Sequence, residues 1–93
     1  MTGNDTSILT GLYALFYRKA DEEKAEYYDK LLKLPNNISA VEVAKIERHI
    51  LILDKFQSEL FYKERDEKIP YRHSRAYDEE IAKYDKIING GMT

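Results

Sequence analysis

The stretch SAVEVAKIERHILILDKFQSELFYKERDEK, residues 39–68, decides the fold of this chain. Ser39 and Glu42 have the spacing of a capping box, which satisfies free N–H groups at the start of a helix. No glycine or proline interrupts the 29 residues after Ser39. Its apolar residues recur at helical spacing and share one face of the wheel; they are Val43, Ile46, Ile50, Leu53, Phe56, Leu60 and Phe61. The stretch therefore predicts a long amphipathic helix over about residues 40–67.

A second long helix is predicted before this stretch, over about residues 7–33. Asp5, Thr6 or Ser7 can cap it, and an apolar series at helical spacing follows. The series is thin over residues 18–26, which allows either one continuous helix or a break near Ala20 with Asp21 as a new cap. We favour the continuous helix because good helix formers fill this part. The sequence Leu34-Pro35-Asn36-Asn37-Ile38 ends it in a short turn, so the two helices should be antiparallel neighbours.

A shorter third helix is predicted over about residues 75–88. Ile69-Pro70 marks the break before it, Ser74 is the expected cap, and Asn89-Gly90-Gly91 is the expected end. Its apolar stripe is Tyr77, Ile81, Tyr84 and Ile88. The fold class is therefore all-α: one domain over residues 1–93, with a long antiparallel helical hairpin and a third helix in a three-helix bundle-like arrangement.

The composition excludes several classes of protein. The chain has 93 residues, a net charge of −2, no cysteine, no tryptophan and eight tyrosines. Without cysteine there is no disulfide, thiolate catalysis or thiolate-bound zinc. No 18-residue apolar run and no basic leader pattern is present, so we expect a cytoplasmic protein without membrane partners. Tyrosine suits half-buried positions and interfaces, because it joins an apolar ring to a polar tip.

No catalytic or cofactor-binding pattern is found in the chain. His49 and His73 have no second metal ligand at helical i+3 or i+4 spacing, and the four glycines do not form a phosphate-binding loop. We therefore expect no enzyme activity, no cofactor and no metal. His49 is interpreted as a half-buried packing residue, with a pH-sensitive interface group as the alternative. Gln57 lies within the apolar stripe, where it either fixes the register or bonds to a tyrosine of the first helix.

The hairpin register predicts an interaction surface. It places the polar residues 18–26 opposite residues 48–56, which include the apolar run Ile50-Leu51-Ile52-Leu53. The short third helix would lie over Phe56 and Leu60 and leave that run uncovered. An exposed apolar patch marks a contact site for a partner or a second copy. The expected interface residues are Val43, Ile46, Ile50, Leu51 and Ile52. The alternative is that the first helix bends and its alanines allow close packing.

A second candidate surface combines basic and aromatic residues in segment 62–77. Its expected contact residues are Lys68, Tyr71, Arg72, His73 and Arg75. Cations and aromatic rings together can bind phosphates and stack on bases, and Arg and Tyr are equally frequent in protein hot spots.

Two functional hypotheses follow. The first is a small non-enzymatic protein–protein interaction protein, such as an adaptor, an assembly subunit or an inhibitor of a larger complex, which self-associates as a homodimer or larger oligomer. The alternative is a nucleic-acid-binding regulator that uses Lys63, Arg65, Lys68, Arg72 and Arg75.

Overall fold

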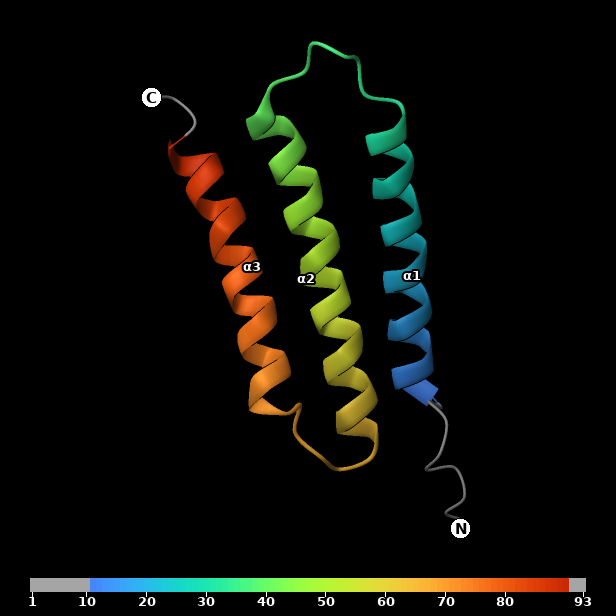
Figure 1. Ribbon diagram of the computed structural model, residues 1–93. Helices are drawn as coiled ribbons and strands as arrows, with labels where there is room; N and C mark the ends of the chain where they lie inside the picture. Colours follow the sequence, from blue (N-terminus) through green and yellow to red (C-terminus); the bar gives the residue numbers. More distant parts are fainter. Residues whose placement is uncertain (1–10, 91–93) are drawn as a thin grey trace.

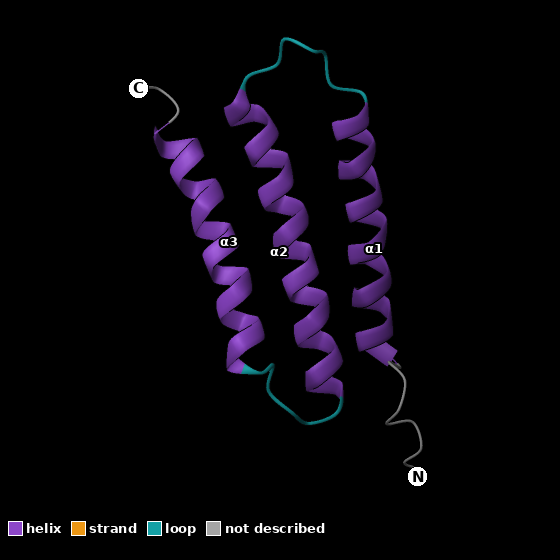
Figure 2. Cartoon of the chain, viewed as in Figure 1, coloured by secondary structure: helices purple, strands orange, loops and turns teal. Residues whose placement is uncertain are grey.

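The computed structural model describes residues 11–90 and has three α-helices: α1 (Gly11–Leu32), α2 (Ala40–Glu64) and α3 (Tyr71–Gly90). Figure 1 shows them as consecutive antiparallel neighbours with α2 in the middle. Figure 2 shows that the described residues contain only helices and loops, without a strand. The all-α fold with three packed helices is thus confirmed.

Helix α1 runs without a break through the polar residues 18–26. Gly11, its first residue, has a φ of +57°, a left-handed conformation that glycine adopts without strain. The expected caps at residues 5–7 and the expected start at residue 7 lie outside the described residues. At the other end, Lys33 N–H donates to the carbonyls of Asp29 and Lys30, which closes the last turn before Pro35.

Helix α2 begins at the predicted cap, because the backbone N–H of Glu42 donates to Ser39 Oγ at 3.2 Å. It ends at Glu64, three residues before the expected end. Asp66 has a φ of +60°, its N–H donates to the Lys63 carbonyl, and the N–H of Glu67 donates to the Tyr62 carbonyl. This is a Schellman motif with aspartate in the position that glycine commonly takes. The helix-forming composition of residues 65–68 concealed this stop.

Helix α3 begins four residues earlier than predicted, and the expected cap at Ser74 is wrong. The N–H of Ser74 donates to the carbonyl of Pro70 at 3.0 Å, so Ser74 lies inside the first turn. Pro70 stands immediately before the first helical residue, and its carbonyl accepts the first hydrogen bond of the helix. With 20 residues, α3 is about 30 Å long and runs beside most of α2.

The three helices form one layer. α1 and α3 both pack on α2 but hardly touch each other, and the Cα atoms span only 13 Å in the thinnest direction. The expected position of α3 over Phe56 and Leu60 is therefore wrong. A second stripe on α2, which includes Lys55, Ser58 and Tyr62, contacts α3 instead. The buried apolar side chains of the described part are Ala20, Ala44, Ile50 and Leu60.

Candidate partner-binding groove

The flat layer presents two opposite faces of α2 to its surroundings. Side chains two positions apart on a helix differ by about 200° in direction. Asp54 and Phe56 therefore belong to different faces, and each lines a different hollow. The two faces also differ in chemistry, which distinguishes their possible roles.

The face with Asp54 carries a groove that all three helices line. It consists of one hollow of about 480 Å³ and another of about 230 Å³, which share Asp54 and so lie end to end along α2. Five of the eight tyrosines line it, together with one phenylalanine. These aromatic residues are Tyr17, Tyr28, Phe61, Tyr62, Tyr77 and Tyr84. We call this feature the tyrosine groove.

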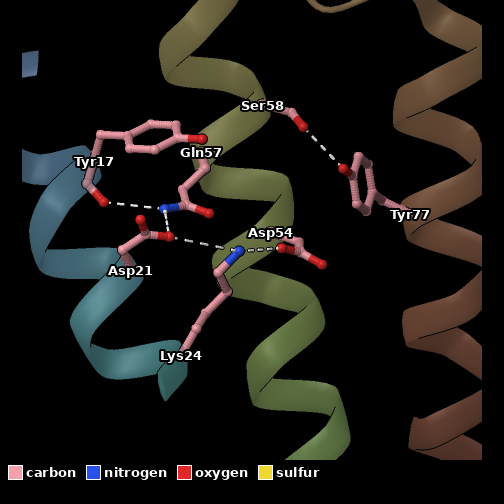
Figure 3. Close-up of polar contacts among 7 residues, drawn as sticks. All are labelled: Tyr17, Asp21, Lys24, Asp54, Gln57, Ser58 and Tyr77. Carbon is pink, nitrogen blue, oxygen red and sulfur yellow. Dashed lines mark hydrogen bonds and ion pairs between the residues drawn. The ribbon is translucent and has the colours of Figure 1, made fainter. Parts of the chain in front are cut away.

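A polar network between α1 and α2 crosses the floor of the tyrosine groove (Figure 3). Lys24 Nζ donates to Asp54 Oδ1 at 2.6 Å and lies 4.0 Å from Asp21 Oδ1. Gln57, which is 5% exposed, donates from Nε2 to the backbone carbonyl of Tyr17 and to Asp21 Oδ1, both at 3.0 Å. This confirms a hydrogen bond from Gln57 to a tyrosine of the first helix, with the carbonyl as acceptor.

Lys24 is the cation of this network, and its side chain is 17% exposed. Burial acts to lower its pKa, but the hydrogen bond to Asp54 and the charges of Asp54 and Asp21 outweigh burial and raise the pKa above its ordinary value of 10.5. Lys24 therefore stays charged at neutral pH, and it holds Asp54 in place on the groove floor.

Polar pairs also hold the other contacts of α2. On the α3 side, Ser58 Oγ and Tyr77 Oη lie 2.8 Å apart, as Figure 3 shows. On the α1 side, His49 Nε2 lies 2.6 Å from Glu23 Oε2, and its ring stacks on Tyr27 at 4.1 Å. Two further ion pairs join α2 to α3, Arg48–Asp85 and Lys55–Asp78, both at 2.7 Å. Because these pairs have specific partners, they fix the order and register of the layer.

The two ends of the tyrosine groove carry opposite charge. At one end, Glu47 lies beside Tyr84 and forms no ion pair within the described residues. Burial raises the pKa of Tyr84, the nearby charges of Glu47 and Glu80 raise it further, and Lys83, which is paired with Glu80, acts in the opposite direction. At the other end, the guanidinium of Arg65 lies 3.7 Å from the centre of the Phe61 ring. The groove is therefore acidic near the start of α2 and basic near its end.

The opposite face carries an apolar hollow of about 520 Å³ between α1 and α2. Leu12 is 66% exposed, and Phe16 and Phe56 are about two-fifths exposed. The remaining lining residues are Tyr13, Leu60 and Lys63. This hollow lacks the tyrosines and the cross-helix polar network of the other face.

The predicted interface residues do not form the exposed patch that was expected. Ile50 is buried against the neighbouring helices, and Val43, Ile46, Leu51 and Ile52 are half-buried. The expectation that a monomer leaves Leu51 and Ile52 uncovered is wrong, because α3 is longer than predicted and lies along this side of α2. Ile50 and Leu51 lie on the floor of the tyrosine groove beside Tyr84.

The alternative contact residues lie in and after the loop between α2 and α3. Lys68, Tyr71, Arg72, His73 and Arg75 are all exposed. Arg75 forms an ion pair with Glu79 at 2.8 Å, and His73 lies 6.4 Å from the Tyr62 ring at the end of the tyrosine groove. The structure thus brings His73 to the groove and leaves Arg75 engaged on the surface of α3.

The convergence of the tyrosines is the feature that sequence reasoning missed. Their number is visible in the composition, but Tyr17 and Tyr28 belong to α1, Tyr62 to α2, and Tyr77 and Tyr84 to α3. Only the side-by-side arrangement of the three helices brings them to the same groove. A helical wheel of each segment alone cannot show this.

The described residues contain no cluster of His, Cys, Asp or Glu side chains that could hold a metal ion. Among them there is also no helix with the length and apolar character needed to span a membrane. Comparison of the chain with protein-family models, with curated proteins and with solved structures gives no significant match.

Proposed function

We propose that this protein is a non-enzymatic protein–protein interaction module that binds a protein partner through the tyrosine groove. The observation that carries this proposal is the gathering of six aromatic side chains from three helices along one groove. Tyrosine is enriched in protein interfaces because it offers a large rigid contact area and a hydroxyl that can bond at the rim.

The groove walls can accept a partner without large rearrangement. Tyr28 is 49% exposed and Phe61 is 44% exposed, so both rings still have apolar surface to bury. Beneath them, the Lys24–Asp54 pair and the Gln57 amide are already bonded within the layer. Binding would therefore bury aromatic surface, worth about 25 cal/mol per Å² of apolar area, and leave these floor bonds intact.

Paired variants test this function by affinity capture from the native source. The double variant Tyr28→Ser/Phe61→Ser removes two exposed groove rings. The control Tyr71→Ser removes a ring that is 76% exposed and lies outside the groove. We expect the groove variant to lose the captured protein and the control to retain it, with helicity checked by circular dichroism. Equal capture by both variants would contradict the proposal.

Self-association and nucleic-acid binding remain the competing proposals. For nucleic acid, the exposed cations near the groove's basic end are the supporting feature, whereas the carboxylates of Glu47 and Asp54 on the groove floor repel phosphate. Affinity for a nucleic acid would fall steeply with salt concentration, whereas an aromatic protein interface responds weakly. A salt titration of the captured complex separates these cases.

A further inference from the structure

The tyrosine groove has the length and width to bind one helix. It extends along α2 from Glu47 to Tyr62, which is about 22 Å at 1.5 Å per residue. With neighbouring axes 8–10 Å apart, the axes of α1 and α3 are roughly 16–20 Å apart. A helix about 10 Å in diameter can therefore rest over α2, with α1 and α3 on its two sides.

A helix also suits the chemistry of the groove better than an extended peptide. The groove lining consists of side chains on three helices, and the described residues offer no strand edge that could pair with a peptide backbone. An extended peptide would leave its own N–H and C=O groups unpaired against aromatic rings, whereas a helix bonds them internally.

The charge difference between the two ends gives that helix a direction. The N-terminus of a helix carries a partial positive charge and the C-terminus a partial negative one. The acidic end, with Glu47 beside Tyr84, attracts the N-terminus of the bound helix, whereas the reverse direction would place the negative C-terminus beside this carboxylate. A helix in this direction is parallel to α2 and antiparallel to α1 and α3, which run beside it.

We propose that the occupant of the tyrosine groove is a single amphipathic helix of about four turns from a partner protein, parallel to α2, with basic side chains in its first two turns beside Glu47. Its apolar stripe covers Tyr28, Ile50 and Phe61, and its basic side chains supply Glu47 with the ion pair that it lacks in the free chain. This inference rests on the proposed function and specifies its partner.

The probe for this proposal is a synthetic stapled helical peptide of 16 residues with a leucine stripe and two arginines in its first two turns. It is titrated into the full chain, once with a nitroxide at its N-terminus and once with the nitroxide at its C-terminus. We expect the N-terminal label to broaden amide signals near Glu47 and Tyr84. The C-terminal label should broaden signals near Phe61 and Tyr77.

Charge variants provide the second readout. Glu47→Lys and the milder Glu47→Gln should weaken peptide binding, the former about tenfold, since an attraction becomes a repulsion. A peptide with glutamates in place of the two arginines should recover affinity for Glu47→Lys. The matched control Glu59→Lys, on an exposed position of the same helix outside the groove, should bind like the unmodified chain.

Three outcomes would overturn the inference: no binding of the peptide, broadening around Phe56 and Lys63 on the opposite face, or the reverse order of the two labels. Sedimentation would also detect a dimer formed through the groove. If such a dimer excludes the peptide, the occupant is a second copy of the chain, and the inference is overturned. Failure of this inference can be distinguished from failure of the proposed function. The capture experiment with the groove variant tests whether the groove binds a protein at all, whatever the shape or direction of the bound segment.

Discussion

Gln57 is the buried polar side chain that holds α1 and α2 in register. Its amide donates to one backbone carbonyl and one carboxylate of α1, and both acceptors lie within one turn. Such a pair of bonds is satisfied in only one alignment of the two helices. A leucine at this position could pack in many alignments of α1 against α2. The glutamine therefore selects one alignment at an interface with few buried apolar side chains.

Replacement of Gln57 by alanine should lower the free energy of unfolding by about 1–3 kcal/mol, because it leaves the Asp21 carboxylate with fewer partners and opens a gap. The control Glu59→Ala changes an exposed residue of the same helix and should stay within about 0.5 kcal/mol. Urea unfolding followed by circular dichroism measures both. Equal costs would show that the bonds of Gln57 do not determine the packing.

Lys24 should make stability depend on pH in the alkaline range. Its pKa in the folded chain is raised above 10.5, so its contribution is fully present below 10.5 and is lost as pH rises through the folded value. Lys55, paired with Asp78, and Tyr84 also have raised pKa values and act in the same direction. The stability difference between the unmodified chain and Lys24→Met should therefore shrink above pH 10.5. A constant difference across this range would argue against the Lys24–Asp54 pair.

At the scale of the elements, α2 is the helix that packs on two neighbours within residues 11–90. It contributes Ala44, Ile50, Gln57 and Leu60 to the buried set, whereas α3 contributes none among the described residues. α3 packs on α2 through half-buried side chains, with Tyr77, Ile81 and Tyr84 among them, and through partly exposed polar pairs that contribute about 0–1 kcal/mol each. It is therefore the element that opens most easily.

Native-state hydrogen exchange should show this order. We expect amides of residues 71–90 to open at a lower free energy than those of residues 44–60, because α3 has no buried side chain, whereas α2 has four. Uniformly slow exchange over all three helices would contradict this order. It would also indicate a more closed arrangement than a single layer.

The helices could be predicted from the sequence, and their ends only in part. The cap at Ser39 and the stop at Pro35 depend on local chemistry, which a sequence reveals. The stop at Asp66 was missed because aspartate adopts the left-handed conformation less often than glycine. The position of α3 was missed because the second stripe of α2 is largely polar and is visible only once its partners Asp78 and Asp85 are known.

The candidate site was less predictable than the fold. Ile50 and Leu51 were named as contact residues, and both lie on the groove floor, but the aromatic walls come from residues on the edges of three separate helices. Their convergence depends on the angle between α1 and α3 around α2, and this angle results from packing. No pattern within one segment encodes it.

At the scale of the whole molecule, a layer of three helices leaves apolar side chains exposed on both faces. Leu12, Phe16 and Phe56 surround the hollow on the face opposite the tyrosine groove. Exposed apolar patches of this kind are typical of interaction sites. We expect the unmodified chain at tens of micromolar to sediment as a dimer or larger, and Phe16→Ser/Phe56→Ser to shift it toward monomer. A monomer of the unmodified chain would contradict self-association without affecting the groove.

Site-specific photocrosslinking in the native source tests the central claim, that the tyrosine groove is the partner-binding surface. A benzophenone amino acid replaces Tyr77 on the groove wall in one variant and Tyr71 outside the groove in another. The groove position should give one discrete adduct with another protein, which the Tyr28→Ser/Phe61→Ser background abolishes, and the outside position should give none. Equal adducts from both positions, or an adduct from Tyr71 alone, would contradict the claim.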